Sequence, residues 1–173
     1  MEFRIARIED LKQLKITYKE IIKNMNKNNI QIWDDIYHCE FFEDDINNKR
    51  LYVIANDEEI ISAFALCDNN AGEAYVEWSE RSAKAMYIDR LGVNVEYSKK
   101  GIGQQMLNKA KEISKSIGAE YLRLFVVDIN KPAIRLYQKM VSQKLMEFMM
   151  RCLTMDMFYV KLDMKSSCKI NPN

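Results

Sequence analysis

Residues 86–103 read MYIDRLGVNVEYSKKGIG, which places a strand pattern, a short polar loop and two glycines in succession. The strand pattern covers Met86–Val93, and the loop covers Asn94–Lys100. An apolar stripe at helical spacing then predicts a helix over Gly101–Ile117. Gly118 stands where the C-terminal cap glycine of that helix belongs.

The next apolar run, Tyr121–Val127, is a second strong strand pattern. A helix that joins two strands of one sheet implies a parallel pair with a right-handed crossover. A further helix is predicted over Lys131–Met140.

The rest of the chain adds two helices and several strands around this centre. Apolar residues recur at helical spacing before residue 50, and the period changes to two from Leu51 onward. A polar stretch, Ser166–Asn173, is expected to be a frayed, disordered tail. The predicted helices cover Ile8–Met25 and about Ile36–Ile46, and the predicted strands cover Phe3–Ala6, Leu51–Ala55, Ile60–Cys67, Ala74–Trp78 and Phe158–Met164.

Composition suits one globular domain over residues 1–173, with 48% hydrophobic and 29% charged residues. The 26 basic and 25 acidic side chains nearly cancel, so no nucleic-acid partner is expected. No apolar run approaches the ~20 residues that span a bilayer, so no membrane partner is expected either. The N-terminus does not resemble a signal peptide. We therefore expect a cytoplasmic protein.

Metal binding is not expected. Zinc and redox sites need closely paired ligands, whereas the cysteines here are far apart and His38 is the single histidine. Idle thiols in a reducing compartment are the simpler interpretation. The four cysteines are Cys39, Cys67, Cys152 and Cys168.

The start of the helix at Gly101 has the features of an anion site. Gly101 and Gly103 lack side chains that would keep a ligand away from the backbone. Unpaired N–H groups and the helix dipole favour negative charge there, and Lys99 and Lys100 add positive charge. The alternative interpretation is a glycine-containing loop that enters an ordinary helix. A dinucleotide fingerprint is disfavoured because Met106 occupies its third glycine position, and no Gly-Lys-Ser/Thr of a P-loop is present.

The ordered combination of these motifs resembles the GNAT acetyltransferase superfamily. The family motif is Arg/Gln-x-x-Gly-x-Gly/Ala, followed by an Asn and then a Leu-Tyr pair. The resemblance covers about Met86–Met140. It implies an α/β fold with a central, mixed, mostly antiparallel sheet, a splayed parallel strand pair and helices on both faces. The matching residues here are Leu91-Gly92-Val93, Glu96 to Gly103, Asn130, Ala133 and Leu136-Tyr137-Gln138-Lys139.

The resemblance implies that the chain uses acetyl-CoA as a co-substrate. In the family the pantetheine arm lies along the strand that here ends at Val93, and the loop that follows binds the pyrophosphate. Asn130 would contact the cofactor arm or cap the next helix, where Pro132 suits the first turn. The implied cofactor residues are Leu91, Gly92, Val93, Ser98, Lys99, Lys100, Gly101, Ile102, Gly103, Gln104, Asn130 and Tyr137.

The resemblance also assigns Tyr137 the role of general acid to the departing sulfur. The alternative is that Tyr137 packs on a helix face with Ala133, Leu136 and Met140. A tyrosine pKa near 10 lies above a thiol pKa near 8.5, so full proton transfer is slightly uphill. A hydrogen bond to the developing thiolate is then the larger effect.

Direct transfer to an amine in a ternary complex is expected, because the motif places no cysteine as a nucleophile. Glu77 and Asp89 are candidate bases, although an acid on a strand is more often at the surface or paired with a residue such as Arg90. The acceptor, a small-molecule or peptide amine, is expected near Gln31, Trp33 and Tyr37, which could equally be core. A homodimer is also considered.

Two departures from the family pattern leave a second hypothesis open. Ser98 stands where the motif has Arg or Gln, and Met140-Val141-Ser142 replaces the usual Gly-Phe. The strand expected next is hard to locate in Gln143–Phe158. These departures favour a non-catalytic acyl-CoA-binding sensor or regulatory module on the same fold. Retention of Tyr137 favours the enzyme.

Overall fold

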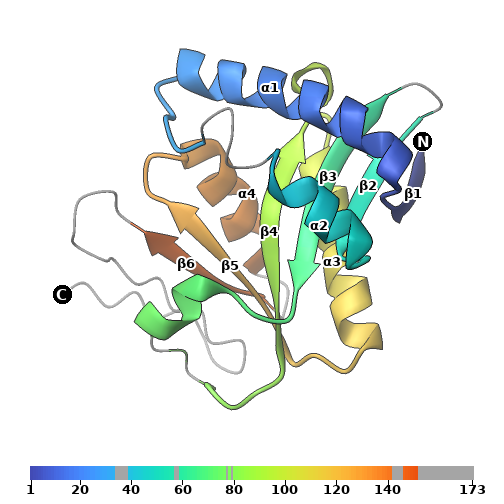
Figure 1. The fold of residues 1–173 in the computed structure, drawn as a ribbon. Helices are drawn as coiled ribbons and strands as arrows, with labels where there is room; N and C mark the ends of the chain where they lie inside the picture. The colour runs from blue at the N-terminus through green and yellow to red at the C-terminus, as the bar shows by residue number, and fades with distance from the viewer. Residues whose placement is uncertain (34–38, 57–58, 77, 79, 142–145, 152–173) are drawn as a thin grey trace. The chain divides into compact units, whose positions relative to one another are not determined.

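The fold was analysed in a computed structural model, shown in Figure 1. It describes residues 1–33, 39–56, 59–76, 78, 80–141 and 146–151. The chain divides into two compact units. Unit 1 comprises Met1–Leu66 and Asp89–Met106, and unit 2 comprises Cys67–Ile88 and the chain from Leu107 onward.

Unit 1 is built on antiparallel strands. β1 (Glu2–Ile5) pairs with β2 (Leu51–Ala55), and β2 pairs with β3 (Ile60–Cys67). All eight residues of β3 are buried, which explains why its sequence is an almost continuous apolar run. The end of β4 (Ala85–Val93) is held beside β3 by a hydrogen bond from the Asn94 N–H to the Ile61 carbonyl, 2.8 Å.

Two helices cover this part of the sheet. α1 (Leu11–Lys27) follows the short 3-10 helix η1 (Ile8–Asp10), and α2 (Phe41–Asn47) lies against β2 beside α1 (Figure 1). The helical spacing in α1 arises from one buried face. That face consists of Leu14, Thr17, Tyr18, Ile21 and Ile22.

Unit 2 contains the parallel strands. The ladder between β4 and β5 (Tyr121–Val127) runs from Ala85 with Tyr121 to Ile88 with Leu124. α3 (Ile102–Ser116) begins in unit 1 and leads into unit 2, where Gly118 ends it with a φ of +75°. α4 (Lys131–Val141) then leads to β6 (Met146–Arg151), which pairs with β5 in parallel.

The buried guanidinium of Arg123 on β5 contacts several aromatic and polar groups of unit 2. It lies 4.5 Å from the centre of the Trp78 ring, and its nitrogens donate to the Tyr87 hydroxyl at 3.2 Å and the Glu80 carbonyl at 2.8 Å. Its carboxylate partner is Glu73, at 3.4 Å. Burial, together with the hydrogen bond to Glu73, raises the pKa of Tyr87 to about 12. Tyr87 therefore remains a neutral donor and acceptor in this core.

The predicted fold class, mixed α/β with antiparallel strands, a parallel pair and helices, is confirmed. The predicted strand at Ala74–Trp78 is wrong, because Ala74 and Tyr75 belong to the 3-10 helix η2 (Ala71–Tyr75) and neither Val76 nor Trp78 lies in a strand. Asn70 caps η2 by accepting from the Gly72 N–H at 2.8 Å, which turns the chain out of an extended path. The predicted splay of the parallel pair, which involves both units, stays a prediction.

Predictions for the C-terminal part of the chain have different outcomes. The strand that the sequence pattern leaves unlocated is β6, at Met146–Arg151. The predicted strand Phe158–Met164 and the tail Ser166–Asn173 lie outside the described residues. Over the ranges that the structure describes, no helix is both long and apolar enough to cross a membrane.

Candidate functional site

The loop between β4 and α3 is fixed to the start of β3 by one carboxylate. Glu59 accepts from the Asn94 side-chain amide at 2.7 Å and from the Tyr97 hydroxyl at 3.0 Å. The hydrogen bond to Glu59 raises the pKa of Tyr97. Asn94 also accepts from the Glu96 N–H at 3.1 Å and so starts the short 3-10 helix η3 (Val95–Tyr97). The loop therefore enters the glycine segment from a fixed position.

The segment Lys99–Gly101 turns sharply into α3. Lys99 and Gly101 have φ values of +61° and +82°, in the left-handed region. No atom lies within 4 Å of where a Gly101 side chain would begin, so the reason for glycine is backbone conformation and not space. Left-handed residues in a turn make concave groups of N–H donors that bind anions, and the first turn of a helix adds more. This segment can hold a phosphate.

Side chains around the turn add positive charge at the surface. Ser98, Lys99 and Lys100 are exposed, and the Lys100 ammonium lies 5.0 Å from the centre of the Tyr97 ring. The Ser98 N–H donates to the Val95 carbonyl at 3.1 Å. The donors expected to face an anion are therefore those of Lys99 to Gln104.

Gly92 on β4 is required by the packing of α1. A side chain at Gly92 would begin 2.8 Å from Tyr18 Cζ and 3.1 Å from Ile21 Cδ1. The Gly92 carbonyl accepts from the Ser62 hydroxyl at 2.6 Å, which ties β4 to β3. Together with the Asn94 N–H, this places the backbone groups of residues 92 and 94 toward β3. Because such groups alternate along a strand, those of Leu91 and Val93 point away from β3.

Replacing Gly92 with alanine should lower the free energy of unfolding by about 1–3 kcal/mol, because Tyr18 must move to accept the added carbon. Gly101→Ala should cost about 1 kcal/mol, from backbone conformation alone. Asparagine, which tolerates left-handed backbone, is the matched test. At position 101, asparagine should lower the free energy of unfolding less than alanine does. At position 92, asparagine should lower it more than alanine does, because its side chain is larger. Denaturant unfolding measures all four variants, and the same ranking at both positions would contradict these two reasons.

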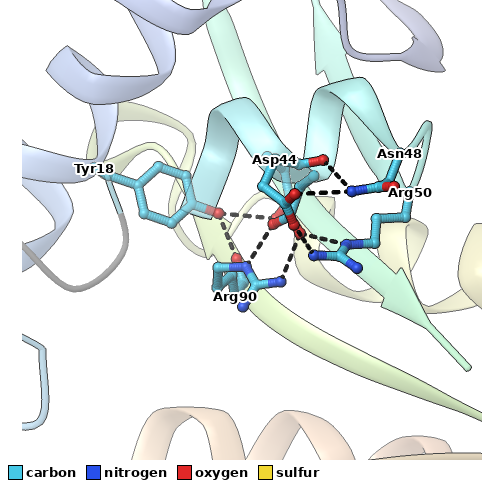
Figure 2. Close-up of polar contacts among 7 residues, drawn as sticks. Tyr18, Asp44, Asn48, Arg50 and Arg90 are labelled. Atoms are coloured by element: carbon cyan, nitrogen blue, oxygen red, sulfur yellow. Dashed lines mark hydrogen bonds and ion pairs between the residues drawn. The ribbon is translucent and has the colours of Figure 1, made fainter. Parts of the chain in front are cut away.

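Tyr18, Arg90 and Asp45 form a polar cluster beside Gly92, and Figure 2 labels Tyr18 and Arg90 in it. The Tyr18 hydroxyl donates to the Arg90 carbonyl, with the Ala63 carbonyl oxygen 3.2 Å away as a second acceptor. Burial raises the pKa of Tyr18 far above its ordinary value, so the hydroxyl keeps its proton. Arg90 has a φ of +56°, which is uncommon for a residue with a side chain.

Asp45, on α2, is completely buried between two guanidinium groups. Its Oδ1 accepts from Arg50 Nε at 2.6 Å and from Arg90 Nη2 at 3.0 Å, and its Oδ2 lies 2.8 Å from Arg90 Nε. Arg50 also donates through Nη2 to the exposed neighbour Asp44 (Figure 2). Arg90 also lies over the Phe41 ring, with 5.5 Å to its centre.

The residues predicted to bind the acceptor or act as base are only partly described. Gln31 is exposed, and Trp33 is half-buried and stacks on Tyr18 with ring centres 5.9 Å apart. Tyr37 and Glu77 lie outside the described residues. Asp89 is half-buried on β4. Arg90, named as a possible partner for such an acid, pairs with Asp45 on α2.

Asn130 and Tyr137 lie in unit 2, whereas the predicted cofactor residues 91–104 lie in unit 1. Asn130 Oδ1 accepts from the Ala133 N–H at 3.3 Å, which confirms the predicted helix cap. Tyr137 is 8% exposed and shares the buried face of α4 with Ile134 and Met140. Burial raises its pKa well above the ordinary value, so the phenol is a weak acid that remains protonated.

Sequence reasoning missed four residues of this region as parts of the site: Tyr18, Asp45, Ser62 and Arg90. Tyr18 lies within the predicted helix Ile8–Met25, where its spacing indicates only the buried face of α1. The other three make contacts across 30 or 45 residues of chain, which no local pattern reports.

Comparisons with known proteins agree on one family. The family model of the acetyltransferase (GNAT) family matches residues 15–141. The thialysine N-epsilon-acetyltransferase of Bos taurus is 33% identical over 81 residues, which are 47% of this chain and 48% of that protein. The enzyme of the same name from Mus musculus is 32% identical over 76 residues, 44% and 45% of the two chains. The chain thus spans about half the length of these curated relatives.

Solved structures share the fold. An acetyltransferase of the GNAT family from Streptococcus agalactiae has a TM-score of 0.68 at 16% identity, over 80% of this chain and 82% of that one. The PaiA N-acetyltransferase of Thermoplasma acidophilum, solved in complex with coenzyme A, has a TM-score of 0.62 at 22% identity, over 80% and 86%. With the family match extending over residues 15–141, this chain belongs to the acetyltransferase (GNAT) family.

Proposed function

We propose that the protein is an acetyl-CoA-dependent N-acetyltransferase that moves the acetyl group directly to the amine of a small molecule or peptide, in a ternary complex. The observation that carries this proposal is the turn at Lys99–Gly101 that opens α3. Its donors and its lysines suit the pyrophosphate of coenzyme A. Family membership and the structural relative solved with coenzyme A support the same ligand.

The backbone of β4 suits the pantetheine arm. The groups of Leu91 and Val93 that point away from β3 are those that an extended ligand with amide groups pairs with, as an added strand. A backbone N–H of this segment would then stabilise the negative charge that develops on the thioester oxygen. The Ser62 contact contributes by keeping the Gly92 carbonyl on the β3 side.

The chemistry needs a neutral amine and a stabilised leaving thiolate. Neutralising a primary amine of pKa near 10.4 at pH 7 costs about 4–5 kcal/mol, so a base or ordered water must take the proton. Asp89 is the candidate base among the described residues. We assign Tyr137 to the leaving sulfur as a hydrogen-bond donor, because burial raises its pKa and disfavours full proton transfer.

The acceptor class follows from the relatives' names. The two curated relatives described above are each named thialysine N-epsilon-acetyltransferase. Amino acids with a terminal primary amine are therefore the first pool to test, followed by polyamines, aminoglycosides and short peptides. Residues around the half-buried Trp33 are where selectivity for the acceptor should be sought.

The test is incubation of the purified protein with acetyl-CoA and each amine pool, with release of free thiol followed over time. Mass spectrometry identifies the product, and reactions without amine are the control. Amine-dependent release establishes the enzyme. Acetyl-CoA binding by calorimetry without release from any pool would favour the non-catalytic acyl-CoA-binding module, which Ser98 in the Arg/Gln position supports. Absence of binding would contradict both.

Acetyl-pantetheine, which lacks the pyrophosphate, tests the loop itself. If the turn at Lys99–Gly101 binds the pyrophosphate, we expect affinity for acetyl-pantetheine to be at least about tenfold below that for acetyl-CoA. The difference should shrink as salt is raised, because Lys99 and Lys100 are exposed and screened. Calorimetry at two salt concentrations measures it. Equal affinities would remove the loop from the cofactor site.

A further inference from the structure

We propose that Asp45 is a positioning residue, which acts through Arg90 to set the backbone of β4 at Leu91–Val93. This inference rests on the proposed function, in which that backbone binds the cofactor. Nothing in the family comparison or in the sequence pattern assigns a role to Asp45.

Arg90 adopts a conformation that its side chain disfavours. Its φ of +56° lies in the left-handed region, within a strand where residues otherwise have negative φ. Such a conformation persists only where the surroundings impose it. Leu91–Val93 follows directly, so the direction of its backbone groups depends on the turn at Arg90.

Contacts from two helices hold Arg90 at both its backbone and its side chain. α1 contributes Tyr18, whose hydroxyl donates to the Arg90 carbonyl. α2 contributes Asp45, which meets the guanidinium at 2.8 Å and 3.0 Å, and Phe41, whose ring lies against it. Only a carboxylate can pair with both Arg90 and Arg50, and Asp45 lies completely buried between them. The cluster in Figure 2 therefore clamps one residue of β4.

A role in positioning differs from a role in stability, because only the former depends on backbone conformation at residue 90. Arg90→Ala and Arg90→Gly remove the same ion pairs and leave Asp45 with the same remaining partner, Arg50. Glycine adopts a positive φ without penalty, whereas alanine does not. Both variants therefore lack the side-chain contacts of Arg90, but only the glycine variant can keep the backbone conformation that those contacts impose.

The experiment compares kcat/KM for acetyl-CoA in these variants, with thermal unfolding to show that each is folded. We expect Arg90→Gly to exceed Arg90→Ala by about tenfold, the order of the left-handed penalty. Asp45→Asn should lower kcat/KM by about tenfold in the wild-type chain and by less than about twofold in the Arg90→Gly chain. Equal values for the alanine and glycine variants, or an equal effect of Asp45→Asn in both chains, would overturn the proposal.

A second measurement does not depend on the cofactor. In the ligand-free protein, the NMR amide shifts of Gly92 and Val93 should match the wild type in Arg90→Gly and be displaced in Arg90→Ala. Failure of the wild type to bind acetyl-CoA would contradict the proposed function alone, since the shifts still test the clamp. Displacement in both variants or in neither would contradict the clamp alone. If Asp45→Asn does not fold, the comparison of Arg90→Gly with Arg90→Ala still tests the proposal.

Discussion

Replacing Tyr137 with phenylalanine should lower the rate of acetyl transfer by about 100-fold while changing the affinity for acetyl-CoA less than about twofold. The phenol is buried on α4, and the substitution removes one oxygen without opening a cavity of consequence. The interaction that we propose this substitution removes is a hydrogen bond to the leaving sulfur, which would strengthen as negative charge develops there. A group that acts mainly in the transition state affects turnover and not ground-state binding.

The matched control is Tyr75→Phe, since Tyr75 is exposed in the same unit. It should leave turnover within about twofold. The raised pKa of Tyr137 adds a pH test, because the protonated form persists above the ordinary tyrosine pKa of about 10. Loss of turnover through ionisation of this residue should therefore be absent up to pH 10. Turnover unchanged in Tyr137→Phe would show that the residue only packs.

Replacing Asp45 with alanine should lower the free energy of unfolding by about 3 kcal/mol. Asp45 is fully buried, and its removal takes away the carboxylate that contacts Arg90, whose side chain is 11% exposed. Arg50 suffers less, because its side chain is 34% exposed and keeps Asp44. Denaturant unfolding, monitored by circular dichroism, measures the difference.

Asp44→Ala is the control that the sequence offers. It removes the adjacent carboxylate from the same Arg50, but Asp44 is 60% exposed, so the loss should stay below about 1 kcal/mol. If both substitutions destabilised the protein equally, burial would not be the reason for the effect. The pair thus compares a buried and an exposed ion pair on one helix.

The fold could be predicted where the burial of a helix or strand is visible in its own stretch of sequence. β3 is an almost continuous apolar run and β5 is largely apolar apart from Arg123, because both strands are mostly buried. α3 shows its stripe because Ile102, Met106 and Ala110 are buried on one face. The wrong strand at Ala74–Trp78 shows the limit of this reasoning. There the cap made by Asn70 decided the conformation, against the apolar alternation that followed it.

The site could be predicted only in part, because its two halves differ in kind. The Lys99–Gly101 turn is encoded locally, by glycines and lysines close to a helix start. The clamp on Arg90 is not, because Asp45 is 45 residues away and is one of several acids in α2. Such a pair becomes visible only when packing brings the two helices and β4 together.

The contact between Gly92 and Tyr18 restricts how this chain can diverge. A side chain at position 92 meets the Tyr18 ring, so a larger residue there should destabilise the protein less after position 18 has become smaller. The smaller residue at 18 would in turn remove the hydroxyl that binds the Arg90 carbonyl. The order that relieves the contact first therefore passes through an intermediate that has lost part of the support for β4.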